Sequence, residues 1–211
     1  MTVNILLVDD HELVRDGIRH LLSLEPSFNV VGCAGTGEEA IGQVERLNPD
    51  VVLMDINMPG IGGTEASRKI VQRYPKVKII ALTVHTEGPF PQQLLNAGAS
   101  GYISKNCDLR ELIRAIRAVV LGKRYISNDV ASLLVDSHNP DSCPFNQLSL
   151  RELQIVEHTL EGKSIQEMAD LLKISTKTVN TYRYRVQEKL GVKNDVELTR
   201  LATKYRLIQD S

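Results

Sequence analysis

Five polar residues directly follow the apolar runs of the first half of the chain that are typical of β-strands. They are two carboxylates after the first run, one after the third, a hydroxyl after the fourth and an ammonium after the fifth: Asp9 and Asp10, Asp55, Thr83, and Lys105. Parallel strands present their carboxyl ends at one edge of a sheet, and ligands bind there. Three carboxylates at one edge repel each other and need a cation, and such a density of oxygen ligands favours Mg²⁺.

A carboxylate beside a divalent cation, a lysine and a hydroxyl is suited to accepting a phosphoryl group. The metal and the lysine neutralise the incoming oxygens, and the hydroxyl can hydrogen-bond to one of them. The chain lacks the G-x-x-x-x-G-K-[ST] loop that cradles nucleotide phosphates. We therefore expect the phosphoryl group to come from a separate donor.

A second group of polar residues lies on a basic stretch near the end of the chain. Residues 173–193 carry six lysines and arginines against the single acid Glu188. A helix beginning after Ser175 would place Val179, Val186 and Leu190 on an inward stripe, and four polar residues on another: Lys177, Asn180, Thr181 and Tyr184. The second helix of a helix-turn-helix presents such a stripe to the major groove.

The polar side chains of this helix suit two different jobs on DNA. Asn180 can pair with adenine, Thr181 can meet a thymine methyl group, and Tyr184 can bond or pack against a base. Lys177, Arg183, Arg185 and Lys189 are better placed for phosphates, which set register and salt dependence rather than sequence.

The elements that must position the first group alternate between strands and helices. We expect strands over 3–8, 30–32, 50–55, 78–82 and 101–104, and helices over 11–23, 38–47, 62–73, 90–97 and 108–121. Five such units imply a parallel sheet with helices on both faces. Near-continuous apolar strands agree with a sheet covered on both sides.

The second half of the pattern is helical. Residues 126–137 predict one more amphipathic turn or helix, and residues 138–144, with two prolines and no periodicity, predict a linker. Ser149, Ser164, Ser175 and Asn194 then open four helices, the first with a capping box to Glu152. We place a first domain at 1–123, a linker with a short helix at 124–147 and an all-α helix-turn-helix domain at 148–211.

Composition limits the classes of protein that fit. The chain has 211 residues, 42% of them apolar and 24% charged, which excludes a disordered, collagenous or disulfide-framework protein. No apolar run is long enough to cross a bilayer, and the start lacks a basic signal-peptide region, so we expect a cytoplasmic protein without a membrane partner. The three cysteines are odd in number and lie far apart in the sequence, so we expect them to be reduced thiols. Residues 1–145 carry net charge −3 and residues 146–211 carry +2, which suggests that the second part meets a polyanion.

Four segments of residues 3–123 resemble, in order and spacing, the two-component response-regulator receiver. They are Val8-Asp9-Asp10-His11, Met54-Asp55-Ile56-Asn57-Met58-Pro59-Gly60, Leu82-Thr83 and Gly101-Tyr102-Ile103-Ser104-Lys105. The resemblance implies a flavodoxin-like, five-stranded parallel sheet with Asp55 as the phosphoacceptor. It implies that Asp10, Asp55 and the carbonyl of Asn57 bind Mg²⁺ directly, and Asp9 through a water. Lys105 would pair with the phosphoryl oxygens. Thr83 and Tyr102 would be the switch pair: Thr83 would move to the phosphate and the tyrosine ring would turn inward.

Residues 148–208 resemble the four-helix DNA-binding domain of the LuxR and NarL/FixJ groups. The matching segments are Leu148-Ser149-x-Arg151-Glu152, Gly162-Lys163-Ser164, Ile165-x-x-Met168-Ala169 and Ile174-Ser175-x-Lys177-Thr178-Val179-Asn180-x-Tyr182-Arg183. Leu150 stands where relatives often have a polar residue. The resemblance implies binding to double-stranded DNA and adds Thr178 to the contact residues above. It also implies that the last helix, 195–206, pairs two subunits, with Val196, Thr199 and Leu201 as interface candidates.

The whole chain looks most like the GacA/UvrY/SirA subgroup, above all in residues 180–185 (Asn-Thr-Tyr-Arg-Tyr-Arg) and 85–89 (His-Thr-Glu-Gly-Pro). That resemblance implies a homodimer formed on phosphorylation, which activates genes for small regulatory RNAs. The phosphodonor would be a membrane-bound hybrid sensor histidine kinase of the BarA/GacS kind. A transcription factor, and not an enzyme, is therefore the expected function.

Three other functions fit parts of the sequence. Gly35-Thr36-Gly37-Glu38-Glu39-Ala40 matches the dinucleotide-binding pattern G-x-G-x-x-A, but it follows the second strand, and the acidic edge would repel a pyrophosphate. A metal-dependent phosphatase would use the clustered aspartates but leaves the basic helix without a role. An orphan regulator would bind DNA without phosphorylation, and would not need the complete acidic site.

Overall fold

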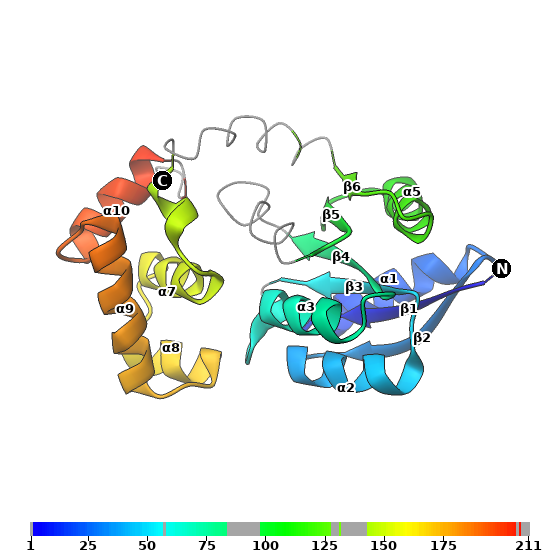
Figure 1. The fold of residues 1–211 in the computed structure, drawn as a ribbon, viewed down its shortest axis with the longest axis horizontal. Helices are drawn as coiled ribbons and strands as arrows, with labels where there is room; N and C mark the ends of the chain where they lie inside the picture. Colours follow the sequence, from blue (N-terminus) through cyan, green and yellow to red (C-terminus); the bar gives the residue numbers. More distant parts are fainter. Residues whose placement is uncertain are drawn as a thin grey trace. The chain divides into compact units, whose positions relative to one another are not determined.

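The computed structural model describes residues 2–56, 58–83, 98–127, 131, 143–205 and 207. These residues form two compact units, each with its own core. Figure 1 shows the first unit as a sheet with helices and the second as helices alone. The helix that we expect over 90–97 lies outside the described residues, as does nearly all of the amphipathic turn or helix that we expect over 126–137.

The first unit is built on a parallel sheet of strand order β2-β1-β3-β4-β5-β6. The strands are β1 (Val3–Val8), β2 (Phe28–Ala34), β3 (Val51–Asp55), β4 (Lys78–Thr83), β5 (Gly101–Ser104) and β6 (Tyr125–Ile126). The described helices are α1 (Glu12–Ser23), α2 (Gly37–Leu47), α3 (Gly62–Arg73) and α5 (Leu109–Val120). The predicted parallel α/β fold is confirmed, and the expected elements that fall on described residues lie within a few residues of their expected bounds.

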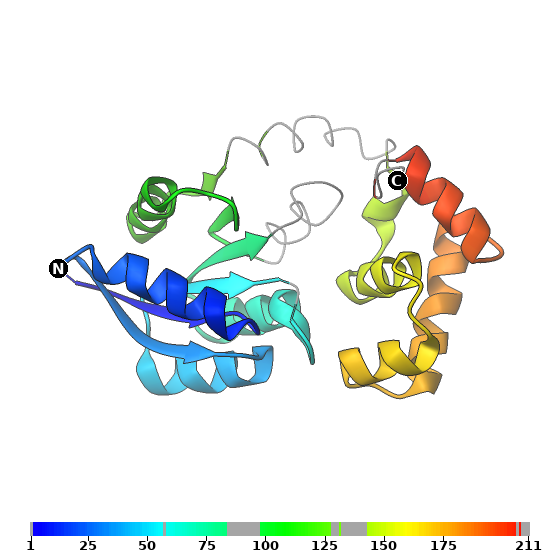
Figure 2. The same ribbon diagram turned by 180° about the vertical axis from the view of Figure 1, so that it is seen from behind.

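Helices cover both faces of this sheet. On one face, Leu22 of α1 and Ile116 of α5 pack with Ile5 and Leu53. On the other, Val44 of α2 and Ile70 of α3 belong to a core with alternate strand residues such as Leu6, Val52 and Ile79. Figure 1 shows α3 in front of the sheet, and Figure 2, seen from behind, shows α1 in front. Successive strand residues point to opposite faces, so near-continuous apolar strands fill both cores.

The sixth strand, β6, is a difference from the expected five-stranded sheet. Tyr125 and Ile126, which we placed in the linker, pair with Gly101 and Tyr102 of β5. Ile126 is therefore in a strand and does not begin the turn or helix that we expected over 126–137. The backbone N–H of Ser127 donates to the carbonyl of Tyr102 at 3.0 Å and continues the edge. A strand of two residues is too short to show an alternating pattern, and only its pairing with β5 reveals it.

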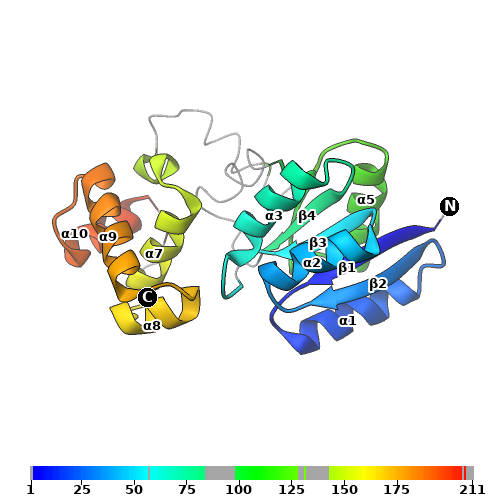
Figure 3. The ribbon, with the colours of Figure 1, turned by 60° about the horizontal axis from the view of Figure 1, so that its bottom comes forward.

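The second unit consists of a 3₁₀ turn, η1 (Pro144–Gln147), and four helices. These are α7 (Leu150–Leu160), α8 (Ile165–Leu172), α9 (Thr176–Leu190) and α10 (Asp195–Lys204). Each of the four predicted N-caps accepts a hydrogen bond from the backbone three residues on, and Ser149 and Ser164 both form capping boxes. Figure 3 shows α9 beside α7 and α8. The predicted four-helix domain is confirmed.

Phe145, also assigned to the linker, is fully buried in the core of the second unit. Its ring meets that of Tyr205 edge to face, with 6.4 Å between centroids. A single aromatic in a proline-containing turn shows no periodicity, so its burial was not predictable.

Within the described residues, no helix has the length and apolar character needed to cross a membrane.

Candidate functional site

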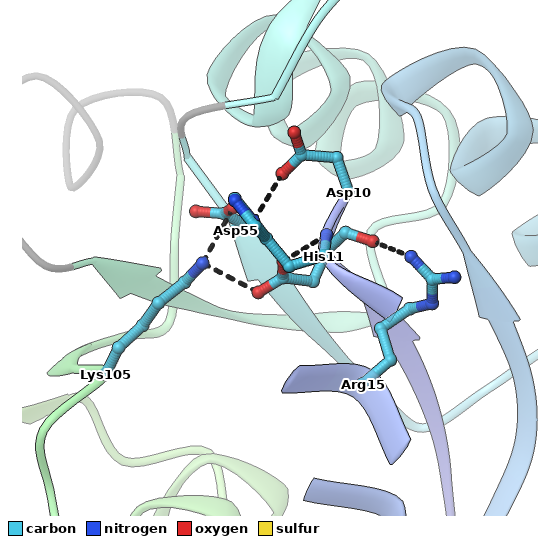
Figure 4. Close-up of polar contacts among 6 residues, drawn as sticks. Asp10, His11, Arg15, Asp55 and Lys105 are labelled. Carbon is cyan, nitrogen blue, oxygen red and sulfur yellow. Dashed lines mark hydrogen bonds and ion pairs between the residues drawn. The ribbon is translucent and has the colours of Figure 1, made fainter. Parts of the chain in front are cut away.

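The register of the central strands brings the predicted carboxylates together at one edge of the sheet. Val8 of β1 pairs with Met54 of β3, so Asp9 and Asp55, the next residues, come side by side. Both are about 2% exposed. Lys105, which follows β5, places its Nζ 2.7 Å from Oδ2 of Asp9 and 2.8 Å from Oδ2 of Asp55. Figure 4 shows the lysine side chain reaching the carboxylate of Asp55.

The charge of Lys105 is maintained in this environment. Burial alone would lower the pKa of its ammonium group, but the bonds to Asp55 and Asp9 outweigh burial and raise the pKa above its ordinary value. The ammonium therefore stays protonated throughout the physiological range. One positive charge thus compensates two buried carboxylates.

Asp10 and His11 complete the exposed side of the site. Nδ1 of His11 lies 3.0 Å from Oδ1 of Asp10 and 3.2 Å from Oδ1 of Asp9, whose Oδ1 also accepts the backbone N–H of His11 at 2.9 Å. Arg15 donates to the backbone carbonyl of Asp9, one turn into α1 (Figure 4). His11 was not among our predicted site residues. Its position next to the aspartate pair was the signal that would have found it.

The donor set fits a hard divalent cation. One ligand atom from each of Asp9, Asp10, His11 and Asp55 lies within 4.8 Å of all the others. Opposite ligands of an octahedral Mg²⁺ are about 4.2 Å apart, since each lies about 2.1 Å from the ion. Three of the four donors are carboxylates, as Mg²⁺ prefers. Asn57, whose carbonyl we also expect to bind the ion, lies outside the described residues.

Thr83 and Tyr102 lie on adjacent strands, β4 and β5, and both side chains are buried. Burial raises the pKa of the Tyr102 hydroxyl, and a hydrogen bond with Thr83 acts in the opposite direction. The backbone N–H of Lys105 donates to the carbonyl of Thr83 at 2.6 Å. The expected switch pair is thus in contact and is joined by the backbone to the lysine of the site. The tyrosine ring is already buried without a phosphoryl group, whereas we expected it to turn inward only on phosphorylation.

On α9 the two predicted stripes are present. Val179 and Val186 are buried, whereas the side chains of Lys177, Asn180, Thr181 and Tyr184 are exposed, Tyr184 by 67%. Two predicted contact residues use their hydroxyls within the helix. Thr181 Oγ1 donates to the carbonyl of Lys177 at 3.0 Å, and Thr178 Oγ1 lies 2.8 Å from the capping Ser175 hydroxyl.

The four predicted phosphate contacts divide into two groups. Arg183 forms two 2.8 Å hydrogen bonds to the carboxylate of Asp195, and Lys189 lies 2.7 Å from Glu152 Oε2. Both therefore link α9 to neighbouring helices. Arg185 instead lies over the ring of Tyr182, 5.9 Å from its centroid. Neither Arg185 nor Lys177 forms an ion pair with a described acidic residue, so these two cations are available to an outside partner.

Comparison with known proteins agrees with both parts of this architecture. Residues 5–117 match the family model described as the response regulator receiver domain, and residues 146–202 match the model described as bacterial regulatory proteins, luxR family. The chain belongs to the LuxR family of two-component response regulators. That family consists of DNA-binding transcription regulators and is not a class of enzyme.

Individual response regulators are similar over the full length. GacA of Pseudomonas viridiflava is 47% identical over 212 residues, with 99% of each chain covered. UvrY of Escherichia coli K12 is 49% identical over 208 residues, which cover 97% of this chain and 95% of UvrY. The predicted likeness to GacA and UvrY is confirmed.

Solved structures of response regulators show the same fold. RcsB of Salmonella enterica serovar Typhimurium, bound to promoter rprA with the phosphomimetic BeF₃⁻, matches with a TM-score of 0.71 and 26% identity over 95% of this chain and 98% of that one. A LuxR-family response regulator of Aurantimonas matches with a TM-score of 0.62 and 40% identity, covering 65% of this chain and 98% of its own.

Proposed function

We propose that this response regulator is a phosphorylation-dependent transcription factor, in which Asp55 accepts a phosphoryl group from a sensor histidine kinase. The observation that supports this most directly is the shared ion pair of Lys105 with Asp9 and Asp55 at the end of the central strands. It holds the Asp55 carboxylate in a buried, positively compensated position, with the partly exposed Asp10 beside it.

The residues of the site have complementary roles in the transfer. A carboxylate oxygen of Asp55 attacks phosphorus, the P–N bond to the kinase histidine breaks, and an acyl phosphate forms. Asp10, Asp55 and the carbonyl of Asn57 would hold Mg²⁺, with Asp9 acting through a water. When bound there, the ion would supply charge neutralisation for the phosphoryl oxygens. Lys105, freed from one carboxylate, would then bond a phosphoryl oxygen.

The output would pass through the switch pair and α9. Thr83 would move to the phosphoryl group while Tyr102 stays inward, and the chain would dimerise and insert α9 in the major groove of double-stranded DNA. The likeness to GacA and UvrY supports genes of small regulatory RNAs as targets and a hybrid kinase of the BarA/GacS kind as the donor. The proposed location is the cytoplasm.

Phosphorylation of Asp55 is tested with the Asp55→Asn variant. The wild-type chain, incubated with Mg²⁺ and acetyl phosphate or a histidine kinase, is expected to form one acid-stable, base-labile acyl phosphate, and the variant none. Binding to chromosomal fragments is then compared with and without phosphorylation. Label retained by the variant would refute the assignment of Asp55. Equal DNA binding by the phosphorylated and the unphosphorylated chain would favour an orphan regulator.

A further inference from the structure

The segment Gly35-Thr36-Gly37-Glu38-Glu39-Ala40, which resembles a dinucleotide loop, contributes none of the groups that touch the phosphoryl group or Mg²⁺ in the proposed phosphotransfer. In the structure it forms the start of α2, where Thr36 accepts the backbone N–H of Glu39 at 3.2 Å. The carboxylate of Glu39 turns back and accepts the N–H of Gly35 at 2.9 Å. Glu38, one residue earlier, instead bonds outside its own turn.

Glu38 reaches the loop between β3 and α3, which begins directly after Asp55. Its Oε1 accepts the backbone N–H of Ile61 at 3.2 Å, across 23 positions of sequence. Gly60 has a φ of +81°, and a Cβ added there would lie 2.7 Å from both carboxylate oxygens of Glu38. The glutamate thus lies closely against two consecutive residues of the loop, and the positive φ at position 60 favours glycine there.

The first turn of α3, which follows this loop, is packed closely against the end of the phosphoacceptor strand. A Cβ on Gly63 would lie 1.7 Å from the carbonyl oxygen of Asp55. The N–H of Gly63 donates to the carbonyl of Ile56 at 3.1 Å. On the α2 side, a Cβ on Gly37 would lie 2.8 Å from Cγ1 of Ile61. The loop therefore lies between the start of α2 and the end of β3 with little space to shift.

We propose that Glu38 is a positioning residue for the phosphoacceptor site: by holding residues 60 and 61 it fixes the described part of the loop that leads from Asp55 to α3. This inference rests on the proposed function of Asp55. A carboxylate that accepts a backbone N–H forms a stronger bond than a neutral acceptor. Residues that orient metal ligands from outside the coordination sphere change metal affinity or activity 10- to 100-fold when they are replaced.

The test compares two variants of Glu38 with a matched control in the full chain. Glu38→Ala removes the acceptor, whereas Glu38→Gln keeps an oxygen at its place. The control is Glu45→Ala, because Glu45 also links α2 to α3, through a 2.9 Å ion pair with Arg73, but at the far ends of both helices. Mg²⁺ affinity is measured by calorimetry, and the acyl-phosphate rate is measured with acetyl phosphate over a series of Mg²⁺ concentrations. Thermal melting of each variant is recorded.

We expect Glu38→Ala to weaken Mg²⁺ binding about tenfold and to raise the half-saturating Mg²⁺ concentration for phosphorylation by the same factor. Glu38→Gln should recover most of both, and Glu45→Ala should match the wild type. Equal effects of Glu38→Ala and Glu45→Ala would mean that only general attachment of α2 matters, and would overturn the proposal, as would wild-type Mg²⁺ affinity in Glu38→Ala. A wild-type chain that binds Mg²⁺ but forms no acyl phosphate would refute the proposed function alone, since calorimetry still decides the role of Glu38.

Discussion

The three aspartates of the phosphoacceptor edge have different surroundings. Asp9 is held from two sides, by Lys105 at 2.7 Å and by the backbone and ring of His11. Asp55 shares the same lysine and is as deeply buried. Asp10, with 29% of its side chain exposed, is the carboxylate that solvent reaches most easily. An ion entering from solvent would therefore meet Asp10 first.

The first prediction concerns Asp10→Asn. The change replaces a charged oxygen ligand by a neutral amide, and Mg²⁺ affinity is expected to fall at least about tenfold, with slower phosphorylation. Calorimetry is the measurement of choice, because the chain has no tryptophan to report binding by fluorescence. Asp16→Asn, an exposed carboxylate on α1, serves as the control. Unchanged affinity in Asp10→Asn would show that Asp10 is not a ligand.

At the scale of elements, α9 combines three kinds of contact. Its buried valines pack on the second core, and its exposed stripe carries Asn180 and Tyr184. Between these, Arg183 and Lys189 link the helix to Asp195 and Glu152. Arg183 and Lys189 therefore contribute to holding α9 in place, a role that phosphate contacts alone would not require.

The second prediction separates base reading from phosphate binding on α9. Asn180→Ala should cost roughly 1–3 kcal/mol on the specific site and relax base preference at one position. Arg185→Ala should weaken binding to specific and scrambled duplexes alike and lower the salt slope by about one ion. Binding curves at several salt concentrations on matched and scrambled duplexes measure both effects. The roles are reversed if Asn180→Ala weakens all sequences equally and Arg185→Ala changes base preference.

The third prediction concerns the joint between α7 and α9. Burial alone would raise the pKa of the Glu152 carboxyl, but bonds with Lys189 and Ser149 outweigh burial and leave the pKa below its ordinary value. A lowered folded-state pKa means that this stabilisation is complete above about pH 4.5 and is lost as the pH falls through the folded pKa. Glu152→Gln should lower the free energy of unfolding by about 2 kcal/mol at pH 7. It should also make the free energy of unfolding decrease less steeply as the pH falls.

Urea unfolding of the full chain, followed through NMR signals of α7 and α9 between pH 7 and pH 3, measures this effect. Glu188→Gln, an exposed glutamate on α9, is the control and should leave the pH dependence unchanged. A parallel acid response of the wild type and Glu152→Gln would contradict the assignment.

In the whole molecule, the two units have separate cores. Residues at both ends of the segment 124–147, which we placed between the units, belong to the units themselves. Tyr125 and Ile126 extend the receiver sheet, and Phe145 is buried in the second core. The domain limits of 123 and 148 remain a proposal, and both ends of the segment we placed between them take part in packing.

The fourth prediction concerns pairing of two chains through α10. Val196 is 62% exposed and Thr199 is exposed, whereas Leu201, the third interface candidate, packs partly against its own core. Val196→Asp would place charge in a paired surface and should weaken binding of the phosphorylated chain to a two-half-site duplex about tenfold. Binding to a single half-site and phosphorylation of Asp55 should stay at wild-type values. If Val196→Asp bound the two-half-site duplex as tightly as the wild type does, α10 would be excluded as the pairing element.

The sequence alone determined the described α-helices, the first five strands and the edge at which Asp9, Asp55, Thr83 and Lys105 gather. Hydrophobic periodicity and a Ser-x-x-Glu cap act between residues a few positions apart, so their patterns can be read along the chain. The parallel topology then follows from alternating strands and helices, and strand ends in such a sheet meet at one edge.

Only the tertiary structure decided which side chains bond to each other across different elements. The bonds of Arg183 to Asp195, Lys189 to Glu152 and Glu38 to the N–H of Ile61 join residues 12, 37 and 23 positions apart. The β6 pairing and the burial of Phe145 are equally non-local. Such contacts depend on where two elements lie in space, and a surface charge on a helix has the same local pattern whether it meets a neighbouring helix or solvent. For that reason the predicted phosphate contacts included two residues that bond within the protein.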